Sequence, residues 1–305
     1  MKNILFVVML TLISTFCLAQ NFEKDRPVHD APLDQLSPLQ IMEDSLVYFA
    51  DSMSNSPIPE FRVQGGYAFI GKMKQMLKTD RTFEHPFNKL DSSISIVYAP
   101  DKKFRIFTWE LFHSNTEARY YGVVQMNDGS FIPLIDVSDQ IIRGAEDSTF
   151  SNMRWYGCLY YKVMQKKIGE QDVYFLFGWN GNSINGDKKL VEAFGFDNRG
   201  RAIFGAPIFN VIDNRKSKRT KRFILNYKKD SRVSLNYDES KQMIIFDHCE
   251  SQVGDVTKKF TYVPDGTYDG LKWTGTSWDM FLNVIEIADP NNGAIPGIEP
   301  LPSGR

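Results

Sequence analysis

Residues 155–182 read WYGCLYYKVMQKKIGEQDVYFLFGWNGN, and this stretch decides the fold. Two runs within it, residues 156–163 and 173–179, are apolar on both faces, and residues 167–170 provide a turn between them. A strand that is apolar on both faces is normally covered on each side. The pattern therefore predicts a central antiparallel hairpin that a second sheet or the N-terminal helices cover on each side.

The same strand and turn pattern extends outward from this hairpin. From about residue 92 apolar residues alternate with small polar ones, and turn sequences recur at 99–102, 127–129, 197–200, 228–230 and 238–240. We count about a dozen strands and predict a mainly β (α+β) fold, a large antiparallel meander that is sandwich-like or strongly bent. A β-propeller-like arrangement is the alternative, although no blade signature recurs at the period of roughly 40 to 50 residues that such repeats need.

Two helices are expected before the strands. Ser37 and Pro38 form a good N-cap and first-turn pair for a helix over residues 38–53. A second helix follows, and Gly65 and Gly66 weaken its first half. The apolar positions at helical spacing are Leu39, Met42, Leu46, Phe49, Ala50 and Met53 in the first helix and Phe69, Met73, Met76 and Leu77 in the second. Residues 37–90 are thus predicted to be a helical segment packed on an antiparallel β domain over 91–288.

The N-terminus has the features of a secretory signal peptide. Lys2 precedes an apolar run over residues 4–16, and Ala19 provides the small residue before a cut at Gln20. The run is shorter than the roughly 20 residues that a membrane-spanning helix needs. We therefore predict a signal peptide over 1–19, no transmembrane segment, and an exported product that is periplasmic or extracellular.

A lipoprotein signal ending at Cys17 is the alternative, but Phe16 occupies a place where a small residue is preferred. Residues 20–36 are polar and contain two prolines, which indicates an extended leader. Residues 289–305 are rich in proline and glycine and have no apolar periodicity, which indicates a flexible tail.

The charge balance argues against nucleic acid as a partner, because 36 basic residues face 37 acidic ones. Six basic residues crowd positions 215–222, and in an exported chain we interpret them as a solvated surface loop. Cys158 and Cys249 would meet an oxidising compartment, so they could form a disulfide. Two separate buried thiols are the alternative.

The histidines show no metal-ligand spacing, and no nucleophile, Walker or dinucleotide motif is present, so we predict no metal and no cofactor. Residues 247–250 place an acid, an imidazole, a thiol and a second acid together. In an extended strand Asp247 and Cys249 share one face while His248 and Glu250 share the other. A cysteine–histidine pair would therefore need a partner from another strand.

The loop after the second apolar run carries candidate ligand-binding residues. Trp179, Asn180, Asn182 and Asp187 supply the aromatic, amide and carboxylate groups that stack on a sugar and bind its hydroxyls. The alternative is a polar hairpin loop in which Trp179 packs into the core. A second cluster with the same two interpretations consists of Tyr268, Asp269, Trp273 and Trp278. Asp265 and Asp269 around Gly266 resemble part of a calcium loop, but their spacing favours a turn.

Residues 155–162, 175–182, 194–207, 244–248 and 262–273 resemble an uncharacterised family of secreted Bacteroidota proteins. The resemblance covers roughly residues 90–285 and implies an exported β-rich domain without a known activity. We therefore expect a non-catalytic envelope protein that binds or scaffolds a glycan or a protein partner, in an oligomeric state that the sequence leaves open. The alternative is an envelope hydrolase whose acidic residues converge from separate strands.

Overall fold

The computed structural model describes residues 37–285, except 115–116, 142, 182–185 and 214–215. The described residues from Met42 to 285 belong to one compact unit. The predicted signal peptide, leader and tail lie outside the described residues. Within the described part of the chain, no helix is both long enough and apolar enough to cross a membrane.

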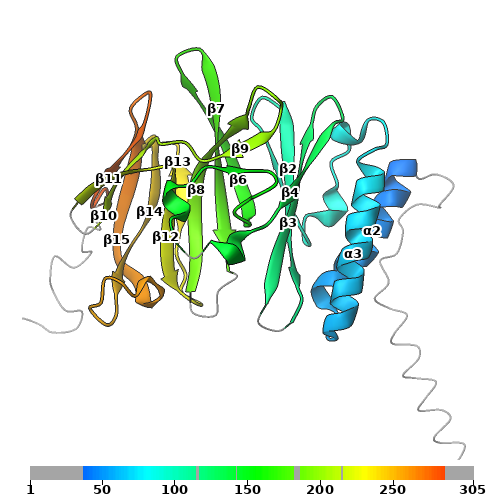
Figure 1. The fold of residues 1–305 in the computed structure, drawn as a ribbon, viewed down its shortest axis with the longest axis horizontal. Coiled ribbons are helices and arrows are strands. Elements are labelled where there is room, and N and C mark those ends of the chain that lie inside the picture. The colour runs from blue at the N-terminus through cyan, green and yellow to red at the C-terminus, as the bar shows by residue number, and fades with distance from the viewer. Residues whose placement is uncertain (1–36, 115–116, 142, 182–185, 214–215, 286–305) are drawn as a thin grey trace, which may run out of the picture. The chain divides into compact units, whose positions relative to one another are not determined.

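Over the described residues the fold is mainly β, with more than twice as much strand (47%) as helix (21%) and with two α-helices, which confirms the predicted class. Three sheets are present among the described residues, and none closes into a barrel, as expected for a β-sandwich. They have four, six and six strands and stack face to face rather than forming a ring of similar blades (Figure 1). The propeller alternative is therefore not what the described chain adopts.

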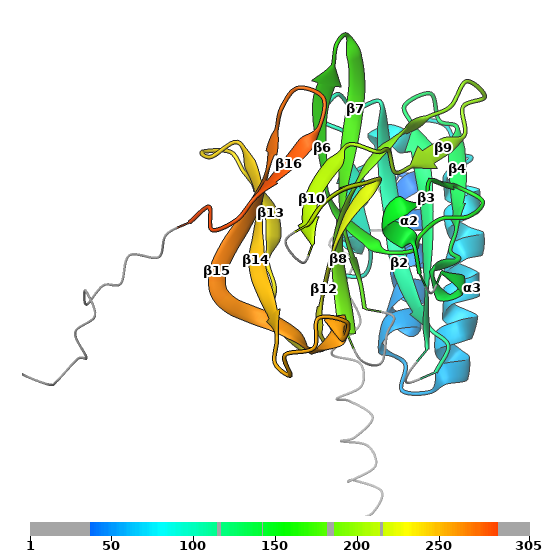
Figure 2. The ribbon, with the colours of Figure 1, turned by 60° about the vertical axis from the view of Figure 1, so that its left-hand side comes forward.

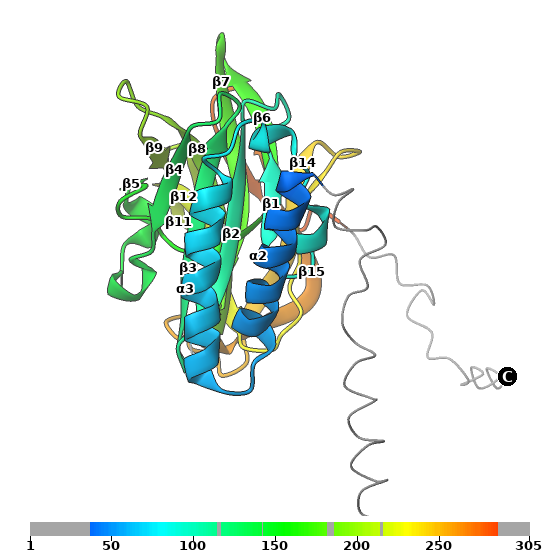
Figure 3. The same cartoon turned by 90° about the vertical axis from the view of Figure 1, so that its right-hand side faces the viewer.

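The two helices are α2 (Pro38–Asn55) and α3 (Pro59–Met76). They run side by side over the outer face of the first sheet (Figure 3). Gly66 makes this packing close, because a Cβ at this position would lie 2.7 Å from a methyl carbon of Leu111 on the sheet. The glycine pair that weakens the helix in isolation thus lets α3 approach the strands.

The first sheet is a four-stranded antiparallel meander. Its strands, in spatial order, are β1 (Ser95–Tyr98), β2 (Phe104–Phe112), β3 (Ala118–Met126) and β4 (Phe131–Ile135). Tight turns join neighbouring strands, and the turn between β3 and β4 contains Gly129 at φ +86°, a conformation that favours glycine.

The middle sheet contains the apolar hairpin that the sequence predicts. Its strands are β5 (Phe150–Ser151), β9 (Ala202–Phe204), β8 (Gly186–Phe196), β7 (Gln171–Asn180) and β6 (Leu159–Ile168), and β12 (Arg222–Lys228) also pairs with β8. All of these pairings are antiparallel. The predicted hairpin over residues 156–179 corresponds to β6 and β7.

The third sheet does not follow chain order. Its spatial order is β11 (Lys216–Thr220), β10 (Phe209–Asp213), β16 (Trp278–Phe281), β15 (Tyr262–Trp273), β14 (Met243–Ser251) and β13 (Leu235–Asp238). The last strand among the described residues, β16, lies between β15 and β10 and pairs with β10 in parallel. This is the one parallel pairing among the described named strands.

Apolar side chains cover both faces of the middle sheet, as its sequence predicts. Residues such as Tyr160 and Leu176 pack with Phe104 of the first sheet in one cluster. Phe175 and Phe177 of β7 pack with the third sheet in another cluster. The three sheets are seen in succession in Figure 2, with the middle sheet between the other two.

The cysteines are free thiols, and they lie in different apolar clusters. Cys158 is fully buried between the first and middle sheets. Cys249 is buried with Tyr227 and Val233 in a smaller cluster. The structure thus has the two separate buried thiols and not the disulfide that the sequence left open.

One member of the basic cluster is not at the surface. Lys216 and its neighbours in β11 are exposed, but Arg222 is fully buried and pairs with the equally buried Glu192, with 2.8 Å between Nη2 and Oε2. The interpretation of all six basic residues as a solvated loop is therefore wrong for Arg222. Its carboxylate partner lies 30 positions away in the sequence, on β8.

Candidate functional site

An open hollow of about 730 Å³ lies where the middle and third sheets meet. Four aromatic side chains from four different strands line it. They are Tyr161 of β6, Trp179 of β7, Tyr227 of β12 and Tyr268 of β15. Because rigid strands carry these rings, their positions are fixed before any ligand arrives.

Packing against the protein holds the Trp179 indole in place. Its ring lies directly over the backbone of Gly181, where a Cβ would come within 2.3 Å of it. Trp179 also packs against the cluster that contains Tyr227 and Cys249. The side chain is only half-buried, so it contacts the core and still lines the hollow.

Charged side chains lie among the aromatic rings. Asp187 is 9% exposed, and its Oδ1 accepts no hydrogen bond within the described structure. Lys229 Nζ lies 3.1 Å from that oxygen, which makes an ion pair without hydrogen-bond geometry. Lys189 lies 5.6 Å from the centre of the Tyr161 ring, and burial lowers the pKa of its ammonium group.

The Tyr227 hydroxyl is also perturbed at this site. Burial raises its pKa to about 12, and the negative charge of Asp187 adds to the effect. The phenol therefore stays protonated at physiological pH and can donate a hydrogen bond.

Of the four ligand-binding residues predicted from the sequence, the structure brings two together. Trp179 and Asp187 both line the hollow. Asn180 is buried and donates from Nδ2 to the carbonyl oxygen of Gly157 at 2.6 Å, so it anchors the end of β7 instead. Asn182 lies outside the described residues.

The second predicted aromatic cluster divides between the core and the hollow. Trp278 is fully buried and packs against Trp273, with ring centroids 5.2 Å apart. Tyr268 lines the hollow. Asp269 is nearly fully buried and belongs to a polar cluster described below.

Glu110 of β2 is a carboxylic acid that interacts electrostatically with Asp187 of the hollow and that sequence reasoning missed. Burial raises its pKa, and Asp187 raises it further while the Lys229 ammonium group opposes both effects. Lys229 is held in position by a hydrogen bond from its Nζ to the carbonyl oxygen of Gly181 at 2.8 Å. Glu110 and Asp187 thus form a pair of interacting acids from separate strands.

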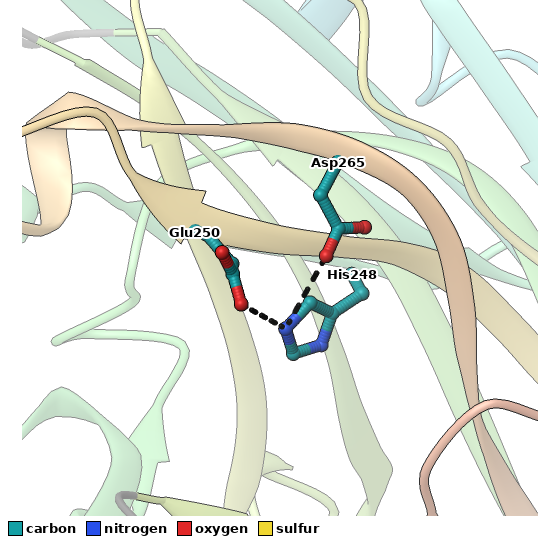
Figure 4. A group of neighbouring side chains, drawn as sticks. All are labelled: His248, Glu250 and Asp265. Atoms are coloured by element: carbon teal, nitrogen blue, oxygen red, sulfur yellow. Dashed lines mark ion pairs between the residues drawn. The ribbon is translucent and has the colours of Figure 1, made fainter.

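A second polar cluster centres on His248 of β14 (Figure 4). Its Nδ1 lies 2.7 Å from Oδ2 of Asp269. Its Nε2 lies 3.8 Å from Oε1 of Glu250 and 3.8 Å from Oδ2 of Asp265. His248, Glu250 and Asp269 also line a separate hollow of about 720 Å³ between strands of the third sheet and β12 of the middle sheet.

An irregularity in strand pairing creates this cluster. Asp247 pairs with Tyr268 and Cys249 pairs with Pro264, so three residues of β15 bulge opposite the single residue His248. Because of the bulge, Asp265 within it and Asp269 just after it both approach the same imidazole. His248 and Glu250 share a face of β14, as the strand alternation predicts.

The carboxylates around His248 change its basicity. Burial lowers its pKa, but the hydrogen bond and charge of Asp269, with the charges of Asp265 and Glu250, outweigh burial and raise it overall. The neighbouring Cys249 thiol has a pKa raised to about 12, first by burial and then by Asp247. The thiol group contacts the carbonyl oxygen of Asp247 at 3.7 Å, and Cys249 and His248 lie on opposite faces of β14.

Comparison of the chain with family models, with curated proteins and with solved structures gave no match in any of the three cases. The resemblance to a family of secreted proteins therefore gains no support from them, and the assignment of function depends on the residues described above.

Sequence reasoning missed Glu110, Tyr161 and Tyr227 because each is an ordinary residue in a strand pattern. Tyr161 and Tyr227 approach Trp179 and Asp187 through strand pairing within the middle sheet, whereas Glu110 comes from the first sheet. The signal that could have found Tyr161 and Tyr227 is the presence of large aromatic residues next to charged ones near strand ends.

Proposed function

We propose that this protein is an exported binding protein that holds a glycan in the hollow formed by Tyr161, Trp179, Tyr227 and Tyr268. The observation that carries the proposal is the combination of aromatic rings with a buried carboxylate oxygen, Asp187 Oδ1, that still has acceptor capacity. Sugars present apolar faces and many hydroxyl groups, so aromatic rings and carboxylates together suit them.

Besides the aromatic rings, the hollow contains polar groups that can accept or donate hydrogen bonds. Asp187 can accept a ligand hydroxyl, while the protonated Tyr227 phenol and the Lys189 ammonium group can donate. The openness of the site to solvent suits part of an extended chain more than a fully enclosed small molecule. A polysaccharide segment of the cell envelope is therefore the ligand class that we favour.

Export is part of the proposal and is supported by the sequence of residues 1–19 alone. An exported protein of this kind would meet envelope polysaccharides directly. Fusion of residues 1–25 to a reporter enzyme that is active only outside the cytoplasm would test it, and an inactive reporter would contradict it.

The binding test uses the chain from residue 20 to 305 and a panel of soluble oligosaccharides, including peptidoglycan fragments. Binding would be followed by calorimetry and by tryptophan fluorescence, because Trp179 is half-exposed in the hollow. The variant Trp179→Ala should weaken binding at least tenfold, which corresponds to about 1.4 kcal/mol. Asp187→Asn should weaken binding while preserving the size of the side chain.

The matched control is Tyr48→Ala, which removes an aromatic side chain that is 72% exposed on α2, outside the hollow. It should bind like the unaltered protein. Binding that is equally strong in Trp179→Ala and Tyr48→Ala would refute this location for the ligand. A protein partner in place of a glycan would appear as specific co-purification from envelope extracts that added oligosaccharide does not compete away.

A second candidate function, a glycoside hydrolase, is supported by one observation. Burial raises the pKa of Glu110, and the negative charge of Asp187 adds to this effect. Glycosidases use a pair of carboxyl groups, and the one that acts as general acid has a raised pKa. The acids also come from separate strands, β2 and β8, as that alternative requires.

The two functions can be separated with the variant Glu110→Gln. A hydrolase should lose its activity on any oligosaccharide that binds, with little change in affinity. A binding protein should show no turnover in either form. Products released by both the unaltered protein and Glu110→Gln would exclude Glu110 as the acid.

A further inference from the structure

The His248 cluster differs from the other charged groups of the protein in its charge balance. Glu250, Asp265 and Asp269 all approach one imidazole, and within the described structure none of the three pairs with a lysine or arginine. Other acids have such partners, for example Asp213, which pairs with Lys259. Even with a protonated imidazole, the cluster carries two negative charges in excess.

The imidazole is oriented from behind by a buried carboxylate. Asp269 is 2% exposed, and its Oδ1 accepts a hydrogen bond from the backbone N–H of Asn283 at 3.0 Å. Its other oxygen contacts His248 Nδ1 at 2.7 Å. With the proton on Nδ1, the lone pair of Nε2 points away from Asp269 and toward Glu250 and Asp265, the arrangement in which histidines bind metal ions.

Asp265 is positioned by the turn that contains it. Its Oδ1 accepts hydrogen bonds from the backbone N–H and the hydroxyl group of Thr267, both at 2.8 Å. The other oxygen, Oδ2, lies 3.8 Å from His248 Nε2. Glu250 approaches from the opposite side on a side chain that is 70% exposed and can adjust its position.

We infer that His248, Glu250 and Asp265 bind one divalent transition-metal ion of the zinc class, with Asp269 as the residue that orients the imidazole. One nitrogen and two oxygen ligands from three side chains suit such an ion better than Mg²⁺ or Ca²⁺, which prefer oxygen ligands alone. The sequence gives no metal-ligand spacing because Asp265 comes from a different strand than the other two.

The distances agree with this ligand set. Two atoms that each lie about 2.1 Å from one ion can be at most about 4.2 Å apart. Both distances from Nε2, at 3.8 Å, satisfy this limit. All three ligand atoms lie within 4.8 Å of one another, so only the exposed Glu250 side chain has to rotate slightly. His248 and Glu250 line the adjacent hollow, which leaves a route for the ion and for water.

The test titrates Zn²⁺ into the untagged, chelator-stripped chain from residue 20 to 305, in competition with a chromophoric zinc chelator. We expect one equivalent to bind and to raise the midpoint of thermal unfolding. His248→Gln, Glu250→Gln and Asp265→Asn should each lower the affinity at least tenfold. Asp269→Asn should lower it by about 10- to 100-fold, as for other residues that orient a ligand.

Asp255→Asn is the matched control, because Asp255 makes the same turn contacts with Thr257 but lies outside the cluster. It should bind Zn²⁺ like the unaltered chain. Absence of stoichiometric binding would overturn the inference, as would unchanged affinity in Glu250→Gln, whose exposed position leaves folding intact. Equal competition by Ca²⁺ would overturn the assignment to the zinc class.

Discussion

The buried ion pair between Arg222 and Glu192 should make a large contribution to the stability of the middle sheet. Both side chains are fully buried. Glu192 Oε2 accepts a hydrogen bond from Arg222 Nε at 2.9 Å and lies 2.8 Å from Nη2, and Oε1 accepts a hydrogen bond from the Tyr160 hydroxyl at 2.6 Å. Arg222 also donates to the carbonyl oxygens of Ser148 and Phe204.

The variant Glu192→Gln keeps the shape of the side chain and removes its charge. Arg222 would then remain as a buried cation without a carboxylate, and breaking such a pair costs about 3–5 kcal/mol of the free energy of unfolding. For a domain of this size, 1 kcal/mol shifts the thermal midpoint by about 2–4 °C. We therefore expect the midpoint to fall by roughly 6–20 °C, measured by circular dichroism and by urea unfolding.

Asp147→Asn is the control, because it breaks an ion pair with Lys218 in which both side chains are about half exposed. Such a pair contributes about 0–1 kcal/mol. If Glu192→Gln destabilises the protein no more than Asp147→Asn does, burial does not increase the contribution of the Arg222 ion pair to stability, and the prediction is wrong.

Three further predictions concern the thiols, one close contact and one acid. In the chain without its predicted signal peptide, Cys158 and Cys249 should not react with a thiol reagent at pH 8, because burial raises the pKa of both thiols. After unfolding, two thiols should react, and a result of no reactive thiol would indicate a disulfide. Gly157→Ala should cost about 1–3 kcal/mol in urea unfolding, since its Cβ would lie 2.3 Å from Asp136 Oδ1, and a neutral effect would contradict this contact. Because the pKa of Glu110 is raised in the folded state, the folded protein loses stability as the pH rises from the ordinary pKa of a glutamic acid through the raised value. Glu110→Gln removes this loss, so it should raise the thermal midpoint at pH 7 more than at pH 4. An equal gain at both pH values would refute this prediction.

The local elements of the fold follow from sequence patterns that act over a few residues. The predicted helix over residues 38–53 matches α2 to within two residues. The apolar hairpin matches β6 and β7 and is covered on both faces. These predictions succeed because periodicity and turn residues depend on neighbours in the chain.

The order of strands in the third sheet and the composition of the sites could not be predicted in the same way. Arg222 looks like a surface residue until β12 pairs with β8 and places it beside Glu192. Likewise, Asp265 reaches His248 only because β15 bulges opposite one residue of β14. The first depends on the pairing of strands that are not consecutive in the chain and the second on an irregularity in strand register, and local composition determines neither.

The position of β16 has a consequence for how the chain is made. The hairpin of β10 and β11 joins the rest of its sheet through this last strand, with Phe209 opposite Trp278 and Asn210 opposite Asp279. A ribosome that has not yet released residues 278–281 cannot complete the sheet, whatever the earlier segments have done. Until β16 has been made, the paired strands β10 and β11 would remain separate from β13, β14 and β15, a period during which a chaperone or an export pathway that keeps chains unfolded could act on them.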